Sequence, residues 1–404
     1  MNLTQRMQHA VRTSQTHAYA IIMPLLLFVV LSFVFPLGMI LVNSIYDPVV
    51  PDGLPRTVSA LAEWNGPRTQ VPPEIVYAAL AQDLKQAVEQ QKVGLIANRL
   101  SIEEPALRAI LANTAIRLVD QNTGPWAPAF AAADPAWARP EIWGTIRNLS
   151  SSTHLLFFLS ALDLHRLPDG TVVSKPEDQR IYIEIYLRTL GVAATVTAIC
   201  MLLGFPLAYA LAHLREKTAN ILLILVLLPL WTSLLVRTTI WMVMLQKEGI
   251  VNWVLQRLGI ISDPIQLIFN QSGVIIAMTY ILLPFMILPM YSAMRQIPAY
   301  YVKAARSLGA GPTTAFLRVY LPQCMSGVGA GMLLVFVLSL GYYITPELIG
   351  GATDQMISYF IADNISRSLN WGLASALAIV LLAAVLPLYM VYDLLIGNNG
   401  SNSQ

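Results

Sequence analysis

The chain has 404 residues, of which 56% are hydrophobic and only 12% are charged, and its mean hydropathy is +0.59. Soluble domains carry about 25% charged residues, so this composition excludes a disordered chain and is atypical of a purely soluble protein. A net charge of +2 gives no electrostatic indication of nucleic-acid binding. The two cysteines, Cys200 and Cys324, are too few for a disulfide scaffold or a cysteine-based zinc site.

Six apolar segments are long enough, or nearly so, to cross a bilayer, which requires about 20 apolar residues. They are residues 13–46, 189–214, 218–245, 264–294, 319–346 and 368–392. The first is too long for a cleavable signal peptide and lacks a small-residue cleavage site. Gly327 and Gly331, four residues apart in the fifth segment, indicate close packing between helices. The sequence therefore predicts an all-α membrane protein with six transmembrane helices.

The basic residues of the short loops predict the orientation, because Lys and Arg concentrate in cytoplasmic loops. Arg6 and Arg12 precede the first helix without an acid, and the loop over 295–318 has four basic residues and no acid. The loop after the fifth helix is acidic and includes Glu347. We therefore expect both termini and the basic loops in the cytoplasm, and the acidic loop outside.

This topology divides the chain into four parts. They are a first segment (1–46), an external insertion (47–186), a core of helices two to six (187–397) and a short tail (398–404). The expected helices of the core cover about residues 187–213, 219–245, 272–294, 325–346 and 372–396.

The insertion over 47–186 has 12 basic and 16 acidic residues and is predicted to be a small, mostly helical cap. Apolar residues at helical spacing predict helices over 74–93, 103–119 and 155–164, and a short strand is expected over 171–173. The cap either packs on the outer face of the membrane helices or offers a docking or gating surface to an external partner. Three tryptophans are expected at such an interface or at a membrane-facing rim. They are Trp126, Trp137 and Trp143.

The most informative segment is the basic loop over residues 297–322, which we call the elbow. Val302, Ala305 and Leu308 lie at helical spacing, and Gly309 to Pro312 interrupts the pattern, which predicts two short helices with a break between them. Neither helix is long enough to be stable alone in water. The elbow must therefore rest on lipid headgroups or in a protein groove.

This segment resembles the EAA loop of the permease subunits of ABC importers. The matching positions are Ala304, Ala305, Gly309, Ala310, Leu321 and Pro322. Lys303 stands where the family has an acid, and Ser326 stands where it has a proline. The resemblance covers residues 186–396 and the first helix. It implies the type I ABC importer permease fold, in a bacterial inner membrane.

In the family that this loop resembles, the elbow is a coupling helix that sits in a groove of a separate ATPase. The resemblance assigns this contact to Ala304, Ala305, Arg306, Leu308, Gly309, Ala310, Leu321 and Pro322. The chain has no G-x-x-x-x-G-K-S/T motif, so ATP and Mg²⁺ are expected on the partner and no cofactor on this chain. The implied partners are an ATPase dimer, a second permease subunit, a periplasmic substrate-binding protein and membrane lipid.

Two further stretches, residues 234–243 and 339–351, resemble polyamine permeases of the spermidine/putrescine type. A polycation requires carboxylates and aromatic faces. The candidate pathway residues are Glu347, Tyr342, Tyr343, Trp231 and Arg237. Glu347 could instead be a solvated acid at a helix end. Arg237 fits an anionic substrate better than a cation, or could extend to the headgroups.

Other functions stay open on the sequence alone. Permeases for iron(III), sulfate and phosphonate share parts of the same pattern. A secondary transporter that works alone tends to have internal repeats or paired ionisable residues in the membrane, and neither is evident in the six segments. A structural membrane subunit would not need a coupling-type loop. The five histidines are too dispersed for a metal site, and no spacing of Ser, His and Asp indicates an enzyme.

Overall fold

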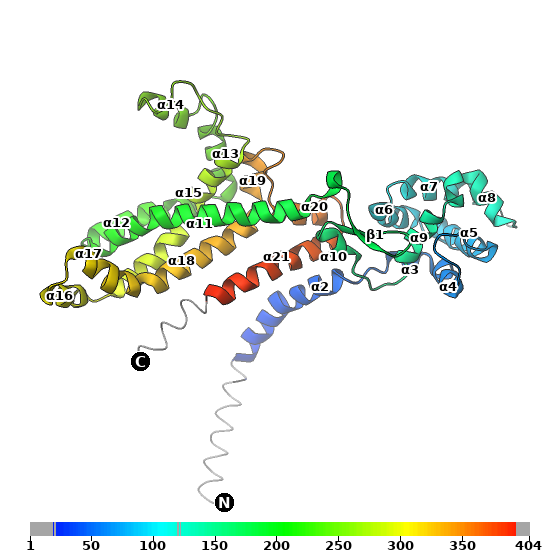
Figure 1. Ribbon diagram of the computed structural model, residues 1–404, viewed down its shortest axis with the longest axis horizontal. Coiled ribbons are helices and arrows are strands. Elements are labelled where there is room, and N and C mark those ends of the chain that lie inside the picture. Colours follow the sequence, from blue (N-terminus) through cyan, green and yellow to red (C-terminus); the bar gives the residue numbers. More distant parts are fainter. Residues whose placement is uncertain (1–18, 20–21, 119–120, 122, 393–404) are drawn as a thin grey trace, which may run out of the picture. The chain divides into compact units, whose positions relative to one another are not determined.

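The computed structural model describes residues 19, 22–118, 121 and 123–392, and it divides into two compact units (Figure 1). Unit 1 comprises residues 1–175 and 370–379, and unit 2 comprises residues 176–369 and 380–404. In the described residues the only sheet has two short strands, and helices make up the rest of the regular structure. The expectation of a largely helical protein is confirmed.

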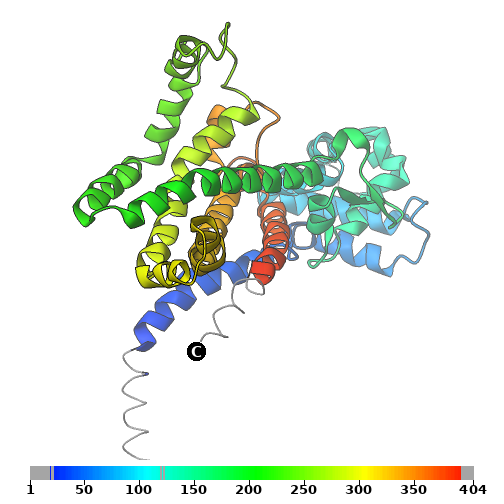
Figure 2. The same cartoon turned by 60° about the vertical axis from the view of Figure 1, so that its left-hand side comes forward.

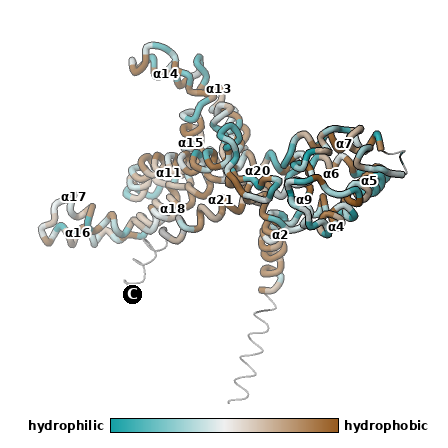
Figure 3. The backbone as a smooth tube through the Cα atoms, turned by 45° about the vertical axis from the view of Figure 1, so that its right-hand side comes forward, coloured by the Kyte–Doolittle hydropathy of each residue, from teal (hydrophilic) through white to brown (hydrophobic). Residues whose placement is uncertain are grey.

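Unit 1 begins with an apolar helix over Ile22–Asn43, in which a π-helical turn, η1 (Val30–Val34), precedes α2 (Phe35–Asn43). Its mean hydropathy is 2.9, and hydrophobic residues dominate α2 in Figure 3. In the most apolar 18-residue stretch of this helix, no residue is buried within the described part of the chain. A 22-residue helix of this kind is long enough to cross a bilayer and requires apolar surroundings along its length.

The insertion follows and is also part of unit 1. Its helices are α3 (Val49–Gly53), α4 (Pro55–Glu63), α5 (Glu74–Glu89), α6 (Val93–Glu103), α7 (Leu107–Leu118), α8 (Trp126–Ala133), η2 (Pro135–Ala138), α9 (Pro140–Asn148) and α10 (Leu156–Ala161). Strand β1 (Leu164–Arg166) then pairs antiparallel with β2 (Val172–Ser174). Prolines begin α4 and α9, where the missing N–H costs no helical hydrogen bond. The helix expected over 74–93 ends earlier, at Glu89, because Gln91 turns the chain with a φ of 56°.

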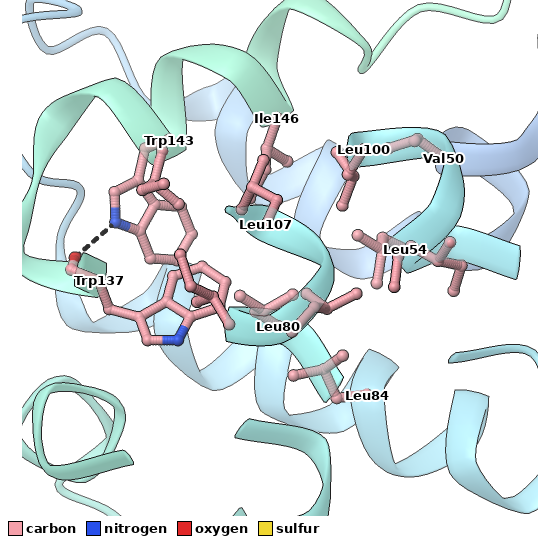
Figure 4. Packing of buried hydrophobic residues seen from close by; sticks show 14 of the residues in the cluster. Val50, Leu54, Leu80, Leu84, Leu100, Leu107, Trp137, Trp143 and Ile146 are labelled. Carbon is pink, nitrogen blue, oxygen red and sulfur yellow. Dashed lines mark hydrogen bonds between the residues drawn. The ribbon is translucent and has the colours of Figure 1, made fainter. Parts of the chain in front are cut away.

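Two tryptophans form part of the insertion's hydrophobic core (Figure 4). Trp137 and Trp143 are 0% and 1% exposed. Trp137 Nε1 donates to Thr114 Oγ1 at 2.8 Å, and Trp143 Nε1 donates to the Trp137 carbonyl oxygen at 3.0 Å, which also accepts from the Tyr77 hydroxyl. The expectation of an interface or a membrane rim is wrong for both residues, because their N–H groups are satisfied inside the core. Trp126 is partly buried at the edge of the same core.

A buried ion cluster holds the chain that leaves α2 against the insertion. Asp47 forms an ion pair with Arg99, and His154 Nε2 lies 3.3 Å from the same carboxylate oxygen. Arg99 Nη1 also lies 3.4 Å from Glu103 Oε1, and the guanidinium carbon of Arg99 lies 4.9 Å from the centre of the Phe157 ring. Burial by itself would raise the pKa of Asp47, but His154 and Arg99 hold that pKa below its usual value. The cluster therefore favours the ionised form of Asp47.

Unit 2 contains most of the remaining helices. They are η3 (Glu177–Gln179), α11 (Tyr182–His213), α12 (Glu216–Leu227), η4 (Leu228–Trp231), α13 (Leu234–Met244), α14 (Ile250–Arg257), α15 (Gln271–Gln296), α16 (Ala299–Ser307), α17 (Pro312–Ala315), η5 (Phe316–Tyr320), α18 (Leu321–Gly341), α19 (Ile344–Ile349) and α20 (Ile357–Ser366). Helix α21 (Trp371–Tyr392) extends from unit 1 into unit 2. The core of unit 2 forms where α11, α15 and α18 pack against one another (Figure 2).

Glycines let α15 and α18 approach closely. A Cβ at Gly327 would lie 2.8 Å from the Pro289 carbonyl oxygen, and a Cβ at Gly331 would lie 3.0 Å from the Met286 carbonyl oxygen. At Gly327 the Cβ would also lie 2.4 Å from the Cβ of Ala293, so this position requires glycine. At Gly331 a side chain would force Met286 to shift. The close packing predicted from the four-residue spacing is confirmed.

In the described part of the chain, four helices are long and apolar enough to cross a membrane. They are Ile22–Asn43, Tyr182–His213, Gln271–Gln296 and Pro312–Gly341. The expectation of a continuous third helix over 219–245 is wrong, since Glu216–Trp231 and Leu234–Met244 are bent by 96°. Ser233 begins the second piece by accepting from the Val236 N–H at 3.3 Å. For the sixth segment, the described apolar part of α21 is short, Trp371–Pro387, and residues 393–396 lie outside the described residues. The count of six stays a prediction.

Candidate functional site

The elbow turns at a glycine whose backbone conformation few other residues adopt. Gly309 has a φ of 90°, and its N–H donates to the Arg306 carbonyl oxygen at 3.0 Å. The next N–H, of Ala310, donates to the Ala305 carbonyl oxygen at 3.0 Å. These bonds satisfy carbonyls at the end of α16, as at many glycine-terminated helices. The chain re-enters a helix at Pro312, so the predicted break is confirmed.

The second short helix that the sequence predicts in the elbow is not a separate helix. Residues from Pro312 onward form the first turns of one 30-residue helix, Pro312–Gly341, and not a separate short helix. A π-helical turn, η5, lies just before Pro322, which is in the first turn of α18. Leu321 and Pro322 therefore lie inside the long helix and not on α16.

Helix α16 and its end present two different faces. Tyr300 and Ala304 lie on one exposed face of α16. Leu308, the residue after the helix, is 90% exposed. Lys303 and Arg306 are exposed as well, but they also line a cavity. Of the candidate coupling residues Ala304 and Arg306, only Arg306 lines this cavity.

The cavity behind α16, which we call the basic cavity, has a volume of about 530 Å³. It is lined by Tyr209, Ala212, His213, Met294, Arg295, Ile297, Pro298, Ala299, Val302, Lys303, Arg306, Pro312, Phe316 and Tyr320. None of these lining residues is acidic. The basic loop is evident in the sequence but the cavity is not, because Tyr209 and His213 come from the end of α11, about 90 residues earlier.

Glu347 lies on a short helix of its own. Helix α18 ends at Gly341, and α19 begins at Ile344, so Glu347 is in the first turn of α19 and not at the end of the fifth span. Its N–H donates to the Tyr343 carbonyl oxygen at 2.9 Å. The expected end of the fifth helix at residue 346 is wrong for this reason.

Glu347 and Tyr343 line a second cavity of about 410 Å³, which we call the acidic cavity. Tyr359, Ala362, Asp363, Ile365, Ser366 and Arg367 complete its lining. Arg367 Nη2 lies 3.9 Å from Glu347 Oε1, and its Nη1 lies 3.5 Å from Asp363 Oδ1. The Arg367 side chain is 69% exposed, so solvent weakens both ion pairs. Tyr359, Asp363 and Arg367 could not be predicted as site residues from the sequence, because α20 reaches this place only through tertiary packing.

The other pathway candidates lie outside both cavities. Helix α13 packs on α19, and Thr238 Oγ1 lies 3.2 Å from Thr345 Oγ1. Arg237 interacts electrostatically with Tyr342, and its Nε is buried without a hydrogen-bond partner among the described residues. Trp231, at the end of η4, is 77% exposed. Of the five candidates, only Glu347 and Tyr343 meet in one cavity.

Known proteins resemble the second half of the chain. Residues 200–399 match the family described as "Binding-protein-dependent transport system inner membrane component". The chain is 36% identical over 212 residues to the spermidine/putrescine transport system permease protein PotB of Salmonella typhimurium (strain SL1344), which covers 52% of this chain and 74% of that protein. PotB of Escherichia coli (strain K12) is also 36% identical, over 52% of this chain and 77% of that protein. PotB of Haemophilus influenzae is 38% identical, over 52% and 74%.

A solved structure shows a weaker similarity. It is a bacterial ABC transporter involved in the import of the acidic polysaccharide alginate, with 18% identity and a TM-score of 0.41. The match covers 54% of this chain and 80% of that one.

Proposed function

We propose a substrate for this chain from its family: it belongs to the binding-protein-dependent transport system inner membrane components and is a permease subunit of an ABC importer. The proposed substrate is a polyamine such as spermidine or putrescine. The similarity to three PotB proteins supports this substrate class. Importers of iron(III), sulfate or phosphonate and a stand-alone secondary transporter are not favoured. The chain is a transporter subunit, and we propose that a separate ATPase binds ATP and Mg²⁺.

The acidic cavity is the observation that carries the substrate class. It combines the carboxylates of Glu347 and Asp363 with the rings of Tyr343 and Tyr359. Carboxylates and ring faces both attract ammonium groups. Arg237 does not oppose a cation there, because it lies beside Tyr342 and not among the residues that line this cavity.

Arg367 occupies the position that a substrate ammonium would take. It contacts both carboxylates at 3.5 to 3.9 Å while most of its side chain is in solvent. A polyamine would displace Arg367 into solvent and exchange one cation for another, so the carboxylates would keep a partner throughout. This exchange would favour substrates with more than one positive charge, because these satisfy both carboxylates at once.

The outward face of α16 is the proposed contact with the ATPase. Leu308 is 90% exposed and Tyr300 is 60% exposed, and large apolar side chains in this state at a helix end are typical of a docking surface. We propose six spans with both termini and α16 in the cytoplasm and with α19 and α20 outside. The proposed assembly also includes a second permease subunit and an external substrate-binding protein. ATP-driven closure of the ATPase dimer would then move α16 and switch the access of the pathway.

The test is spermidine uptake into proteoliposomes that contain the complete importer. Glu347→Gln and Asp363→Asn are each expected to weaken uptake about tenfold, since each removes a charged partner of the ammonium. Glu248→Gln is the matched control, because Glu248 is exposed and does not line the acidic cavity. Arg367→Gln is expected to lower the KM for spermidine by removing the internal competitor.

Two results would contradict the proposal. Normal spermidine uptake by a fully assembled Glu347→Gln, Asp363→Asn double variant would exclude the acidic cavity from the pathway. Absence of spermidine and putrescine uptake by the active wild-type importer would exclude the substrate class itself.

A further inference from the structure

We propose that the basic cavity binds a phosphate-bearing anion, which fastens α16 to the helices on which it rests. The volume of about 530 Å³ is within the range of small-molecule sites. The cavity is distinct from the acidic cavity, with which it shares no lining residue. The proposal therefore does not depend on which substrate the chain transports.

Three positive charges converge on the basic cavity. Arg295 comes from the last turn of α15, while Lys303 and Arg306 come from one face of α16. No acidic residue lines the cavity, and Lys303 and Arg306 form no ion pair with any described residue. Arg295 Nη1 donates to the Ala212 carbonyl oxygen at 3.2 Å, which orients its guanidinium. All three side chains are exposed, so their charges are accessible to a ligand that enters from solvent. Arg and Lys are the usual ligands of phosphate oxygens.

Tyr320 gives a second, independent indication of a ligand. It is 4% exposed, it lines the basic cavity, and its hydroxyl has no hydrogen-bond partner of good geometry among the described residues. The nearby thiol of Cys324 interacts with this hydroxyl but is a weak partner. Buried hydroxyl groups are nearly always hydrogen-bonded, and one that is not destabilises the fold. A ligand oxygen would satisfy the Tyr320 hydroxyl.

The aromatic residues around Tyr320 hold its hydroxyl in position. The ring of Tyr320 lies 5.7 Å from that of Phe316 in a stacked arrangement and 5.5 Å from that of Tyr209 at a near-perpendicular angle. His213 packs against Tyr209 at 4.2 Å, with its Nδ1 2.8 Å from the Tyr209 carbonyl oxygen. The hydroxyl is therefore held in a wall of packed rings, while the cations come from α15 and α16.

The bound anion would link three elements that meet at the elbow. It would join Lys303 and Arg306 on α16 to Arg295 on α15 and to Tyr320 on η5. The outward face of α16, with Leu308, would stay available to a partner. The shared chemistry is a phosphate group, which either an anionic phospholipid headgroup or a soluble phosphate can supply.

The experiment uses the full-length chain with its partner subunits in nanodiscs of phosphatidylcholine, with or without phosphatidylglycerol. Native mass spectrometry counts the phosphatidylglycerol molecules that stay bound, and hydrogen–deuterium exchange is followed over residues 295–320. A second arm adds inorganic phosphate to the nanodiscs of phosphatidylcholine alone. Retained phosphatidylglycerol with slower exchange identifies a lipid ligand, and slower exchange with inorganic phosphate alone identifies a soluble ligand.

Three variants test the assignment of the ligands. Lys303→Gln and Tyr320→Phe are each expected to weaken anion binding about tenfold, the effect of losing one hydrogen bond to a charged group. Tyr320→Phe should not lower the thermal stability of the anion-free chain, because it removes an unsatisfied hydroxyl. Arg318→Gln is the matched control, since Arg318 is an exposed cation of the same loop that does not line the cavity.

Three outcomes would overturn the proposal. The first is the absence of retained lipid and of slower exchange in both arms. The second is an equal effect of Arg318→Gln and Lys303→Gln, which would indicate general surface charge. The third is normal anion binding by Tyr320→Phe, which would show that the buried hydroxyl has no ligand.

Discussion

The turn at Gly309 allows a direct test of the elbow's geometry. Gly309 has a φ of 90°, and a Cβ built there meets no heavy atom within 4 Å. The cost of Gly309→Ala is therefore that of the backbone conformation alone, about 1–2 kcal/mol for a residue with a side chain. Gly311, two residues later, also has open space around its Cβ, but its φ of −64° and ψ of 161° suit any residue. Gly311→Ala is thus a matched control.

A cost of 1–2 kcal/mol corresponds to an approximately 5- to 30-fold lower population of the elbow conformation relative to alternatives. Binding of the ATPase requires this conformation in the proposed assembly, so its affinity should fall by the same factor. The measurements are ATPase affinity and substrate-stimulated ATP hydrolysis of the importer in proteoliposomes. Gly309→Asn should fall between wild type and Gly309→Ala, because Asn tolerates positive φ better than Ala.

The comparison of the two alanine variants decides the matter. Equal ATPase affinity in Gly309→Ala and Gly311→Ala would refute the reasoning that the φ of Gly309 sets the docking geometry. A loss of ATPase affinity in both variants would instead indicate that side-chain volume at the tip of the elbow obstructs the ATPase.

Further predictions concern stability and are measured by thermal unfolding of the full chain in detergent. Trp137→Ala should destabilise the insertion by about 3–5 kcal/mol through loss of a fully buried ring, and a small change would show that the core collapses around the gap. The pKa of Asp47 in the folded chain is below its ordinary value of about 3.8. The stabilising effect of this carboxylate should therefore be complete above pH 3.8 and be lost as the pH falls through the lowered pKa. Asp47→Asn should remove this acid dependence and cost about 3–5 kcal/mol by leaving Arg99 without its buried partner; an unchanged acid profile would contradict this. Gly327→Val should destabilise the contact of α15 with α18 by about 1–3 kcal/mol or more, whereas Gly191→Val, with open space at its Cβ, should not.

The acidic cavity shows how far local pattern could predict the site. Glu347 and Tyr343 were found because they are close in sequence and follow an apolar segment. Asp363 and Arg367 belong to α20, which no short-range pattern connects to α19. Asp363 and Arg367 reach the acidic cavity because α19 and α20 lie together there, and this packing is set by residues far apart in the sequence.

The bend between η4 and α13 shows the same limit for the fold. Residues 218–236 are uncharged and mostly apolar, so hydropathy predicts one continuous helix there. Only the 96° bend of the structure shows that Thr232 and Ser233 interrupt it, with Ser233 capping the next helix. In the insertion, likewise, hydropathy could not distinguish a tryptophan on a rim from one in a core, because both environments suit the indole ring.

The features that depend on neighbouring residues can be predicted from the sequence. Apolar length identified four of the six expected membrane segments as long helices, Gly309 marked the break of the elbow, and the spacing of Gly327 and Gly331 indicated close helix packing. The packing of distant segments sets which residues of α16 line the basic cavity, which residues line the acidic cavity and where Arg367 lies. The physical reason is that helix formation and turns depend on local propensity and hydropathy, whereas the convergence of charges depends on packing between distant segments.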